Sequence, residues 1–411
     1  MLFLLKIITN SLNRFFLTII FISLIFTSED IYKQIQSELI LAKTGDIISL
    51  PEGKFYLSRS LWGENLDNVT IEGKGIDKTI LSFEKQIEGA EGIKIVNSQN
   101  IILSNFTIEN SKGDLIKVED SQKVTFLNIK AQWTYGPKET NGSYAFYPVK
   151  SKDILLDRCT AIGASDAGIY VGQSRNIIVK NCEAYNNVAG IEIENSFNAD
   201  VFNNYVYNNT GGILIFDLPD LMIKNGGSIR AFNNLVIENN LFNFAPEGNI
   251  VSKVPSGTGF MILSVSNVEI FNNIIYNNKT ANTSIVSYSM TGENLTDSLY
   301  NPYPSNIFIH SNIYKRDKQF PSLSFKIPIG YLLTYNFWRD VPDIIYDGIL
   351  DPNKIDSNGL LKDEDRICVI NNINASIANI DAGNDFNNIS TDFEEYNCSH
   401  KSIMPVNIRI D

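Results

Sequence analysis

The stretch from Gly168 to Phe216 decides the fold of this chain. It reads GIYVGQSRNIIVKNCEAYNN, then VA, then GIEIENSFNADVFNNYVYNN, and then TGGILIF. Gly168, Gly190 and Gly212 open equivalent segments that are 22 residues apart. Each segment holds a Gly-apolar-x-apolar strand, a polar turn, a second apolar alternation and an Asn-rich corner. A fixed period of about 20 residues made of short alternating strands indicates a solenoid.

Alternation along these strands predicts two opposite columns of side chains. Side chains of successive residues in a strand point to opposite faces. Isoleucines such as Ile169 and Ile191 therefore point into the solenoid. Tyr170, Glu192 and Leu214 form the outward column, with Glu194 beside it. We expect the function of the protein to lie on this outward column.

Departures from the repeat indicate where a binding surface lies. Insertions occupy residues 131–143, 217–229, 241–258 and 290–304, on either side of the Gly-apolar-x-apolar strands. Insertions in repeat proteins collect on the working face. The sequence therefore predicts a groove along the outward column, and the alternative is that the insertions only shield apolar edges.

The repeat covers most of the chain and predicts one long domain. Of the 411 residues, 44% are hydrophobic, and a solenoid can grow without forming a new core. We expect a β-helix over residues 29–314, capped at its start by a short amphipathic helix at 31–43. Residues 315–411 are predicted to be an irregular region that packs on the other end. Asn-Asn pairs at 203–204, 233–234 and 272–273 are expected to stack at one corner.

The N-terminal segment predicts export. Lys6 and Arg14 precede an apolar run from Phe15 to Phe26, which suits a signal-peptide core and is short for a spanning helix. We interpret residues 1–28 as a signal peptide or an uncleaved anchor, with no other stable membrane span. The predicted location is periplasmic or extracellular.

The net charge, the number of histidines and the positions of the cysteines limit the partners, metal sites and disulfides that we expect. A net charge of −12 disfavours nucleic acid as a partner, and the presence of only two histidines disfavours a histidine-based metal site. Cys159 and Cys182 lie 23 residues apart in equivalent repeat positions, so we expect a stacked pair of free thiols. Cys368 and Cys398 lie in the irregular region, where a disulfide is expected.

Several motifs of this sequence resemble those of a known superfamily. The repeat G-[IVL]-x-[IV], followed by N-x-[IV]-x-[IV]-x-[ND]-[NC], resembles the right-handed parallel β-helix superfamily of pectate lyases, polygalacturonases and alginate C5-epimerases. WTYGPKETNGSYAFYPV, GASDAGIYVGQSRNIIV and GGILIFDLPDL look like an exported bacterial family of parallel β-helix proteins without an assigned reaction. The resemblance implies an all-β, right-handed parallel β-helix. It also implies a polysaccharide ligand and a co-exported protein partner.

Carboxylates around the outward column are the first candidate site residues. Glu192, Glu194 and Asp217 could bind Ca²⁺, divide into acid and base roles, or form a solvated acidic face. No other cofactor is expected. Asp166 could close the turn before the Gly168 strand or act as a base. The epimerases of the superfamily use an Asp-Pro-His-Asp motif, and this chain has SDAG at that place, which puts that mechanism in doubt.

Aromatic and cationic residues complete the candidate site. Aromatic rings beside cations suit stacking on sugars and pairing with uronate carboxylates. A lyase or epimerase also needs a base and a cation that stabilises the developing charge, for which Lys138 and Tyr170 are candidates. The expected binding residues are Trp133, Tyr135, Tyr147, Lys150, Arg175, Glu194 and Asp217.

Two functional classes follow from the sequence. The first is an exported lyase or C5-epimerase that acts on an acidic polysaccharide. The second is a non-catalytic binding or scaffold protein that works with a co-exported partner.

Overall fold

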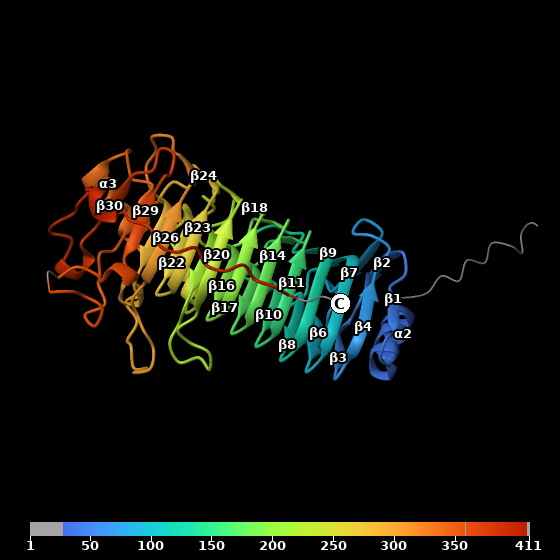
Figure 1. Cartoon of the computed structure of the whole chain (residues 1–411). Helices are drawn as coiled ribbons and strands as arrows, with labels where there is room; N and C mark the ends of the chain where they lie inside the picture. Colours follow the sequence, from blue (N-terminus) through green and yellow to red (C-terminus); the bar gives the residue numbers. More distant parts are fainter. Residues whose placement is uncertain (1–27, 358, 409–411) are drawn as a thin grey trace, which may run out of the picture.

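A computed structural model describes residues 28–357 and 359–408, so the predicted signal segment lies outside the described residues. The chain winds into a parallel β-helix whose coils stack along one axis (Figure 1). Within the described residues, two helices and five short 3-10 turns accompany the strands. They are α2 (Ser28–Leu41), α3 (Ile329–Phe337), η1 (Ile250–Lys253), η2 (Tyr288–Thr291), η3 (Asp363–Asp365), η4 (Ala382–Asn384) and η5 (Glu394–Tyr396).

The strands form two parallel sheets along the axis, which we name sheet A and sheet B. Sheet B has eleven strands: β3 (Arg59–Glu64), β6 (Glu88–Val96), β8 (Ile116–Glu119), β10 (Tyr144–Val149), β13 (Ala167–Gly172), β16 (Ala189–Glu194), β19 (Gly211–Phe216), β22 (Thr258–Leu263), β25 (Ala281–Val286), β28 (Ile344–Tyr346) and β30 (Ile377–Asn379). Sheet A has nineteen strands: β1 (Ile47–Ser49), β2 (Gly53–Tyr56), β4 (Asp67–Glu72), β5 (Thr79–Ser82), β7 (Gln99–Glu109), β9 (Gln122–Gln132), β11 (Lys152–Asp157), β12 (Thr160–Ile162), β14 (Arg175–Lys180), β15 (Glu183–Tyr185), β17 (Phe197–Phe202), β18 (Tyr205–Tyr207), β20 (Gly227–Phe232), β21 (Leu235–Ile237), β23 (Ser266–Phe271), β24 (Ile274–Tyr276), β26 (Ser305–His310), β27 (Ile313–Lys315) and β29 (Ile367–Ile370).

The core lies inside the coils, as the alternation predicts. Ile169 of β13 pairs with Ile191 of β16, which pairs with Ile213 of β19, and all three side chains are fully buried. The same column of apolar side chains continues along the solenoid as one hydrophobic cluster. The parallel β-helix fold predicted from the repeat is confirmed.

Buried asparagines fix the corners between coils. Asn234 accepts hydrogen bonds from the backbone N–H and the side chain of Asn204 at 3.0 Å, and it donates to Asn273 Oδ1 and to Val201 O. The same pattern extends to Asn312, so each asparagine satisfies backbone and side-chain groups of the neighbouring coils. The stacking predicted for the Asn-Asn pairs is confirmed.

The two ends of the solenoid differ in how far they match the predicted boundaries. Helix α2 covers the first coil with Ile31, Ile35 and Leu39, which confirms the expected cap. The solenoid, however, runs beyond residue 314. Strand β28 pairs with β25, β29 with β26, and β30 with β28, all in parallel. Long loops separate these last strands, and they hide the period in the sequence.

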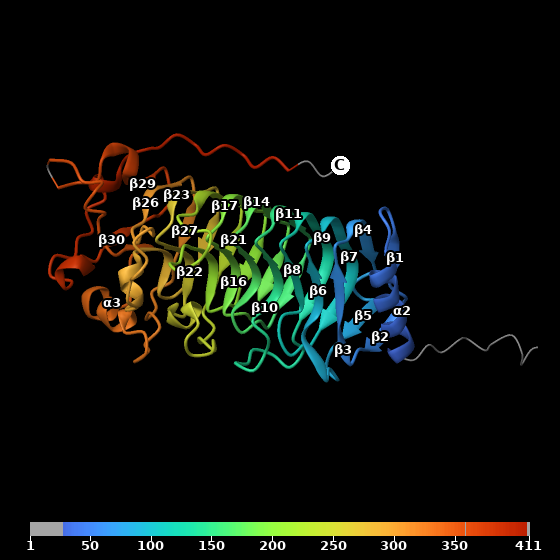
Figure 2. The ribbon, with the colours of Figure 1, turned by 90° about the horizontal axis from the view of Figure 1, so that it is seen from below.

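A C-terminal tail lies along the outside of sheet A. The predicted disulfide between Cys368 and Cys398 is present, and Cys159 and Cys182 are free and buried, as expected. Residues 399–408 then run back towards the end that carries α2 (Figures 1 and 2). The backbone N–H of Val406 donates to Asp200 Oδ2 at 3.1 Å. Within the described chain no helix is long and apolar enough to cross a bilayer.

Loss of the disulfide is expected to loosen the tail without unfolding the coils. The variant Cys368→Ser/Cys398→Ser leaves hydrogen bonds such as the one from the Ile403 N–H to Glu269 Oε2 at 3.0 Å as the remaining attachments. Limited proteolysis should then cleave residues 399–408 faster than in the parent, while residues 28–357 stay intact. Equal cleavage rates in the two proteins would show that the disulfide does not hold the tail.

Candidate functional site

The outer face of sheet B carries one column of side chains along much of the solenoid. Trp62 of β3 pairs with Lys94 of β6, which pairs with Lys117 of β8, and Lys117 pairs with Tyr147 of β10. The ring of Tyr147 then lies 5.1 Å from that of Tyr170 on β13. From there the column continues in register through Glu192, Leu214, Met261 and Ser284. The two halves of this column differ in their access to solvent.

The half beyond Tyr147 is covered. Tyr170 and Leu214 pack in a second hydrophobic cluster with Phe244 and Val254 of the 241–258 insertion. Glu192 is only 1% exposed. The expectation that this part of the column lines an open groove is therefore wrong, because the insertion supplies apolar side chains that seat on it. In this part of the face the insertion shields apolar side chains, which is the alternative given for the insertions.

Buried carboxyl groups meet in the covered half. The Tyr170 hydroxyl donates to Glu194 Oε1 at 2.6 Å, and Asn249 of the insertion donates to Asp166 Oδ2 at 2.9 Å. Gly172 gives this contact its space, because a Cβ there would lie 2.2 Å from the Tyr170 hydroxyl. We call Asp166, Glu192 and Glu194 the buried acid cluster.

Burial sets the protonation of the buried acid cluster. Burial, together with the negative charges of Asp166 and Glu194, raises the pKa of Glu192 well above its usual range. One oxygen of Glu192 has no hydrogen-bond partner within the described chain, which makes its ionised form costly. Burial and the charge of Glu194 raise the pKa of Asp166 to about 8. The cluster therefore holds protons at neutral pH.

The other half of the column is partly exposed, and we call Trp62, Lys94, Lys117 and Tyr147 the cation–aromatic ladder. The Nζ atoms of Lys94 and Lys117 lie 3.5 and 3.2 Å from carboxylate oxygens of Glu91 and Glu119, so an acidic ligand would compete with these ion pairs. The Nζ atom of Lys94 lies 5.0 Å from the centre of the Trp62 ring, and Nζ of Lys117 lies 4.9 Å from that of Tyr147. Trp62 is 43% exposed. Neighbouring strands of a sheet are about 4.8 Å apart, so the ladder presents regularly spaced cations between two rings.

Asp114 provides a titratable group beside the ladder. It is half-buried, and its Oδ1 accepts the Tyr144 backbone N–H at 3.2 Å. Burial raises the pKa of Asp114 to about 6, although Lys117 and Lys94 act in the opposite direction. A carboxylate with such a pKa is ionised at neutral pH and can still accept and return a proton.

The sequence interpretation missed Trp62, Lys94, Asp114 and Lys117. The signal for the two lysines was present, because Lys94 and Lys117 are 23 residues apart, which is the coil period. Asp114 had no such signal. Its raised pKa comes from burial beside the strand, which no local pattern in the sequence reports.

Two further predicted binding residues, Trp133 and Tyr135, and the predicted catalytic residue Lys138 lie apart from the ladder. Trp133 is buried in the core, and its Nε1–H donates to Ser111 O at 3.0 Å, so it offers no ring to a sugar and that prediction is wrong. Tyr135 is exposed and donates to Glu84. Lys138 Nζ lies 5.4 Å from the centre of the Tyr135 ring.

Asp217 is a structural carboxylate in this fold. It is fully buried, and it accepts the backbone N–H groups of Asn225 and Gly226 at 2.6 and 3.2 Å. It therefore closes the 217–229 insertion and does not face a ligand. Lys150 and Arg175 line a groove at a different corner of the solenoid. Among residues 28–357 and 359–408, no group of three or more acidic, histidine or cysteine side chains is placed to hold a metal ion.

Comparisons with known proteins agree with the class defined by this fold. Residues 61–225 match the family described as the right handed beta helix region. The A-module of a mannuronan C-5 epimerase from Azotobacter vinelandii superposes with a TM-score of 0.53 at 14% identity, over 86% of this chain and 91% of that module. The protein is a right-handed parallel β-helix, and the predicted resemblance to that superfamily is confirmed at the level of the fold.

Two other similarities are weaker. An alginate lyase from a Paenibacillus species superposes with a TM-score of 0.45 at 14% identity, over 70% of this chain and 96% of that one, too low to support a functional argument. A pre-neck appendage protein of Bacillus phage B103 is 26% identical over 174 residues, which is 35% of this chain and 20% of that protein. The chain thus spans about a fifth of the length of that curated relative.

Proposed function

We propose that this protein binds an acidic polysaccharide along the cation–aromatic ladder of sheet B. The observation that carries the proposal is the register of Lys94 and Lys117 between the rings of Trp62 and Tyr147. Cations placed at coil spacing can pair with successive uronate carboxylates, and the rings can stack on sugar faces. The fold similarity to the module of a mannuronan C-5 epimerase supports the choice of ligand class.

Binding is expected to depend on the two ladder lysines. The variant Lys94→Met/Lys117→Met keeps the apolar stems of both side chains and removes both charges. We expect its affinity for oligouronates to fall at least tenfold in isothermal titration calorimetry, because two charge-assisted contacts are lost. The matched control Lys33→Met/Lys318→Met removes two exposed charges elsewhere and should bind as the parent does. Equal affinity in all three proteins would refute the ladder as the binding surface.

We further propose that Asp114 removes the C5 proton of a bound uronate. The ladder lysines stabilise the enediolate that forms, and Asp114 holds the proton. In a lyase reaction the C4–O bond then breaks, the C4–C5 double bond forms, and Asp114 gives its proton to the leaving oxygen. In an epimerase reaction the Tyr147 hydroxyl gives its proton to the opposite face of C5, and the proton held by Asp114 returns through solvent to the Tyr147 oxygen. The raised pKa of Asp114 and the closeness of Tyr147 to Lys117 support this assignment.

Turnover is expected to require ionised Asp114. Activity on alginate and pectate, followed by unsaturated-product absorbance and C5 inversion in NMR spectra, should rise with pH through about 6, the pKa of Asp114. The variant Asp114→Asn should lose turnover and keep oligouronate affinity. Binding without any turnover by the parent protein would favour the second candidate function, a non-catalytic binding or scaffold protein.

A further inference from the structure

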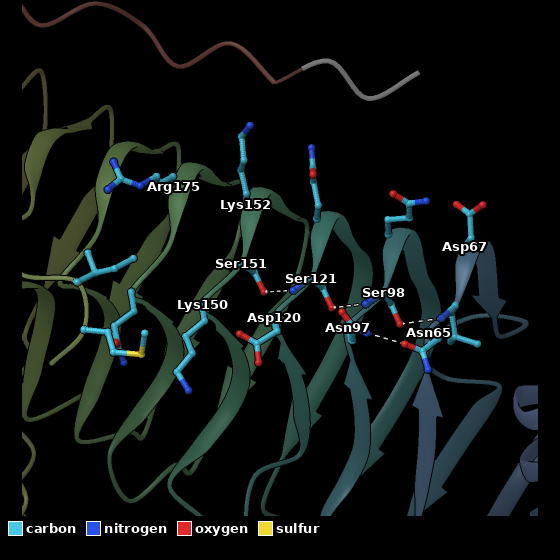
Figure 3. A pocket seen from close by; sticks show the side chains of 16 residues that line it. Asn65, Asp67, Asn97, Ser98, Asp120, Ser121, Lys150, Ser151, Lys152 and Arg175 are labelled. Carbon is cyan, nitrogen blue, oxygen red and sulfur yellow. Dashed lines mark hydrogen bonds between the residues drawn. The ribbon is translucent and has the colours of Figure 1, made fainter.

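A second open groove runs along the corner between the strands of sheet B and those of sheet A. We call it the corner groove; its volume is about 800 Å³. Figure 3 shows a line of serines as its floor, with one row of side chains on each side. One row is Asn65, Asn97, Asp120, Lys150 and Gln173, and the other is Asp67, Gln99, Gln122, Lys152 and Arg175. The ladder and the buried acid cluster contribute no residue to it.

The floor of the corner groove is already satisfied by hydrogen bonds within the coils. Ser121 Oγ accepts the Ser98 backbone N–H at 3.0 Å and donates to Glu119 O at 2.8 Å. Ser151 repeats both contacts one coil further on. A ligand would therefore be recognised by the two rows of side chains and not by the serines.

At the next coil, the equivalent corner is occupied by the chain's own 217–229 insertion. There Asn195 takes the same corner position in the left-handed backbone conformation, with φ of 46°. Its carboxamide donates to Leu218 O and Ile223 O at 2.8 and 2.9 Å, and it accepts the Leu218 N–H at 2.9 Å. Gly226 packs against Ser196 so closely that a Cβ would lie 2.6 Å from Ser196 O. The 217–229 insertion thus lays peptide backbone in the corner and is held there by a carboxamide.

The same carboxamide groups line the open part of the groove, where Asn97 Nδ2 donates to Asn65 Oδ1 at 2.6 Å and leaves Asn97 Oδ1 open to a ligand. Asn65 and Asn97 are exposed and share the left-handed conformation. Gln173 is 9% exposed, and its carboxamide has no hydrogen-bond partner within the described chain. Met222 and Ile223 of the insertion form the apolar end of the groove beside Gln173.

We infer that the corner groove binds an extended peptide segment of a partner protein. The Oδ1 atom of Asn97 accepts a backbone N–H of the peptide, and the Gln173 carboxamide bonds its backbone as Asn195 bonds the insertion. Lys152 and Arg175 lie at the end nearest Gln173, so the segment carries acidic side chains there. Among the described residues no aromatic side chain lines the groove, unlike the ladder, so the described lining lacks the rings that would stack on sugars.

A random linear dodecapeptide library displayed on phage tests the inference. Panning on the parent protein should enrich peptides with Asp or Glu, and synthetic copies of the enriched peptides should bind in solution. The variant Asn97→Gly/Gln173→Gly removes two carboxamides at positions where φ is 50° and 49°, which glycine accepts. The variant Lys152→Glu/Arg175→Glu reverses two charges. Each variant should weaken peptide binding at least tenfold.

Controls separate this inference from the proposed function. Lys33→Glu/Lys318→Glu should bind the peptides as the parent does, and so should Lys94→Met/Lys117→Met, which affects only the ladder. Circular dichroism confirms that each variant is folded. The inference is overturned if no peptide is enriched, or if enriched peptides bind both groove variants as tightly as the parent. It is also overturned if the groove variants weaken oligouronate binding instead, which would make the groove a sugar site.

Discussion

The substitution Asn234→Ala is expected to lower the free energy of unfolding by about 3–6 kcal/mol, because it leaves several buried polar groups without partners at about 1–3 kcal/mol each. Asn234 is 2% exposed and lies in the middle of the stack of buried asparagines at the corners of the coils. Without its carboxamide, the Asn204 backbone N–H, the Asn204 side chain and the Val201 carbonyl each lose a bond. Asn204 and Val201 are 2% and 0% exposed, so these groups lie away from bulk solvent.

The neighbouring residue provides the matched control for this prediction. Asn233 lies on the outer side of the same corner, with φ of 54°. Glycine adopts that conformation without strain, so Asn233→Gly should change stability by well under a third of the Asn234→Ala effect. Urea unfolding followed by tyrosine fluorescence measures both. If the two variants lose the same stability, the hydrogen bonds between the stacked asparagines do not stabilise the corner.

Stability is expected to fall as the pH rises from about 5 to 8. The folded-state pKa of Asp166 is about 8, that of Asp217 about 7 and that of Asp347 about 6, in each case raised mainly by burial from the model-compound value of 3.8. In this window the folded state holds protons that the unfolded state has released. The stabilisation is fully present below the unfolded pKa and is lost as the pH rises through each folded pKa.

The size of this effect is several kcal/mol. A pKa difference of one unit corresponds to about 1.4 kcal/mol, so Asp166 alone contributes roughly 5 kcal/mol between pH 4 and 8. Carboxyl groups with lowered pKa values, such as Glu269, act in the opposite direction but only at more acidic pH. The urea midpoint should therefore be higher at pH 5 than at pH 8. Asp166→Asn should reduce this difference, and Asp120→Asn, at an exposed corner, should not.

A urea midpoint that is flat or that rises between pH 5 and 8 would contradict this assignment. It would mean that the buried acid cluster is reached by water or by a cation in solution. The same experiment with added Ca²⁺ distinguishes these two cases. A cation bound by ionised carboxylates would raise the midpoint most at pH 8.

The repeat made most of the fold predictable. A period of 22–23 residues places Ile169, Ile191 and Ile213 in one column whatever the loops do, because side chains alternate strictly along a strand. The last coils escaped prediction for a physical reason. Strands β28, β29 and β30 are three or four residues long and are separated by loops, so too little pattern remains to reveal the period.

The site was less predictable than the fold. Alternation shows correctly that Tyr170 and Glu192 point away from the core, but it cannot show that Phe244 and Val254 lie on top of them. Burial by a distant insertion is a tertiary property, since 70 or more residues separate Tyr170 from those side chains. Lys94 and Lys117 lie one coil period apart, which is a signal in the sequence. Charged residues on a strand face are, however, usual on a solvated surface, so this spacing alone does not indicate a binding site.

A crystal structure of the protein with a hexauronate bound tests the central proposal most directly. We expect the sugar chain to lie parallel to the solenoid axis on the outer face of sheet B, with carboxylates beside Lys94 and Lys117. A sugar ring should stack on Trp62 or Tyr147, and C5 of one uronate should lie within reach of Asp114. A hexauronate bound only in the corner groove, or on any face without these four contacts, would contradict the proposal.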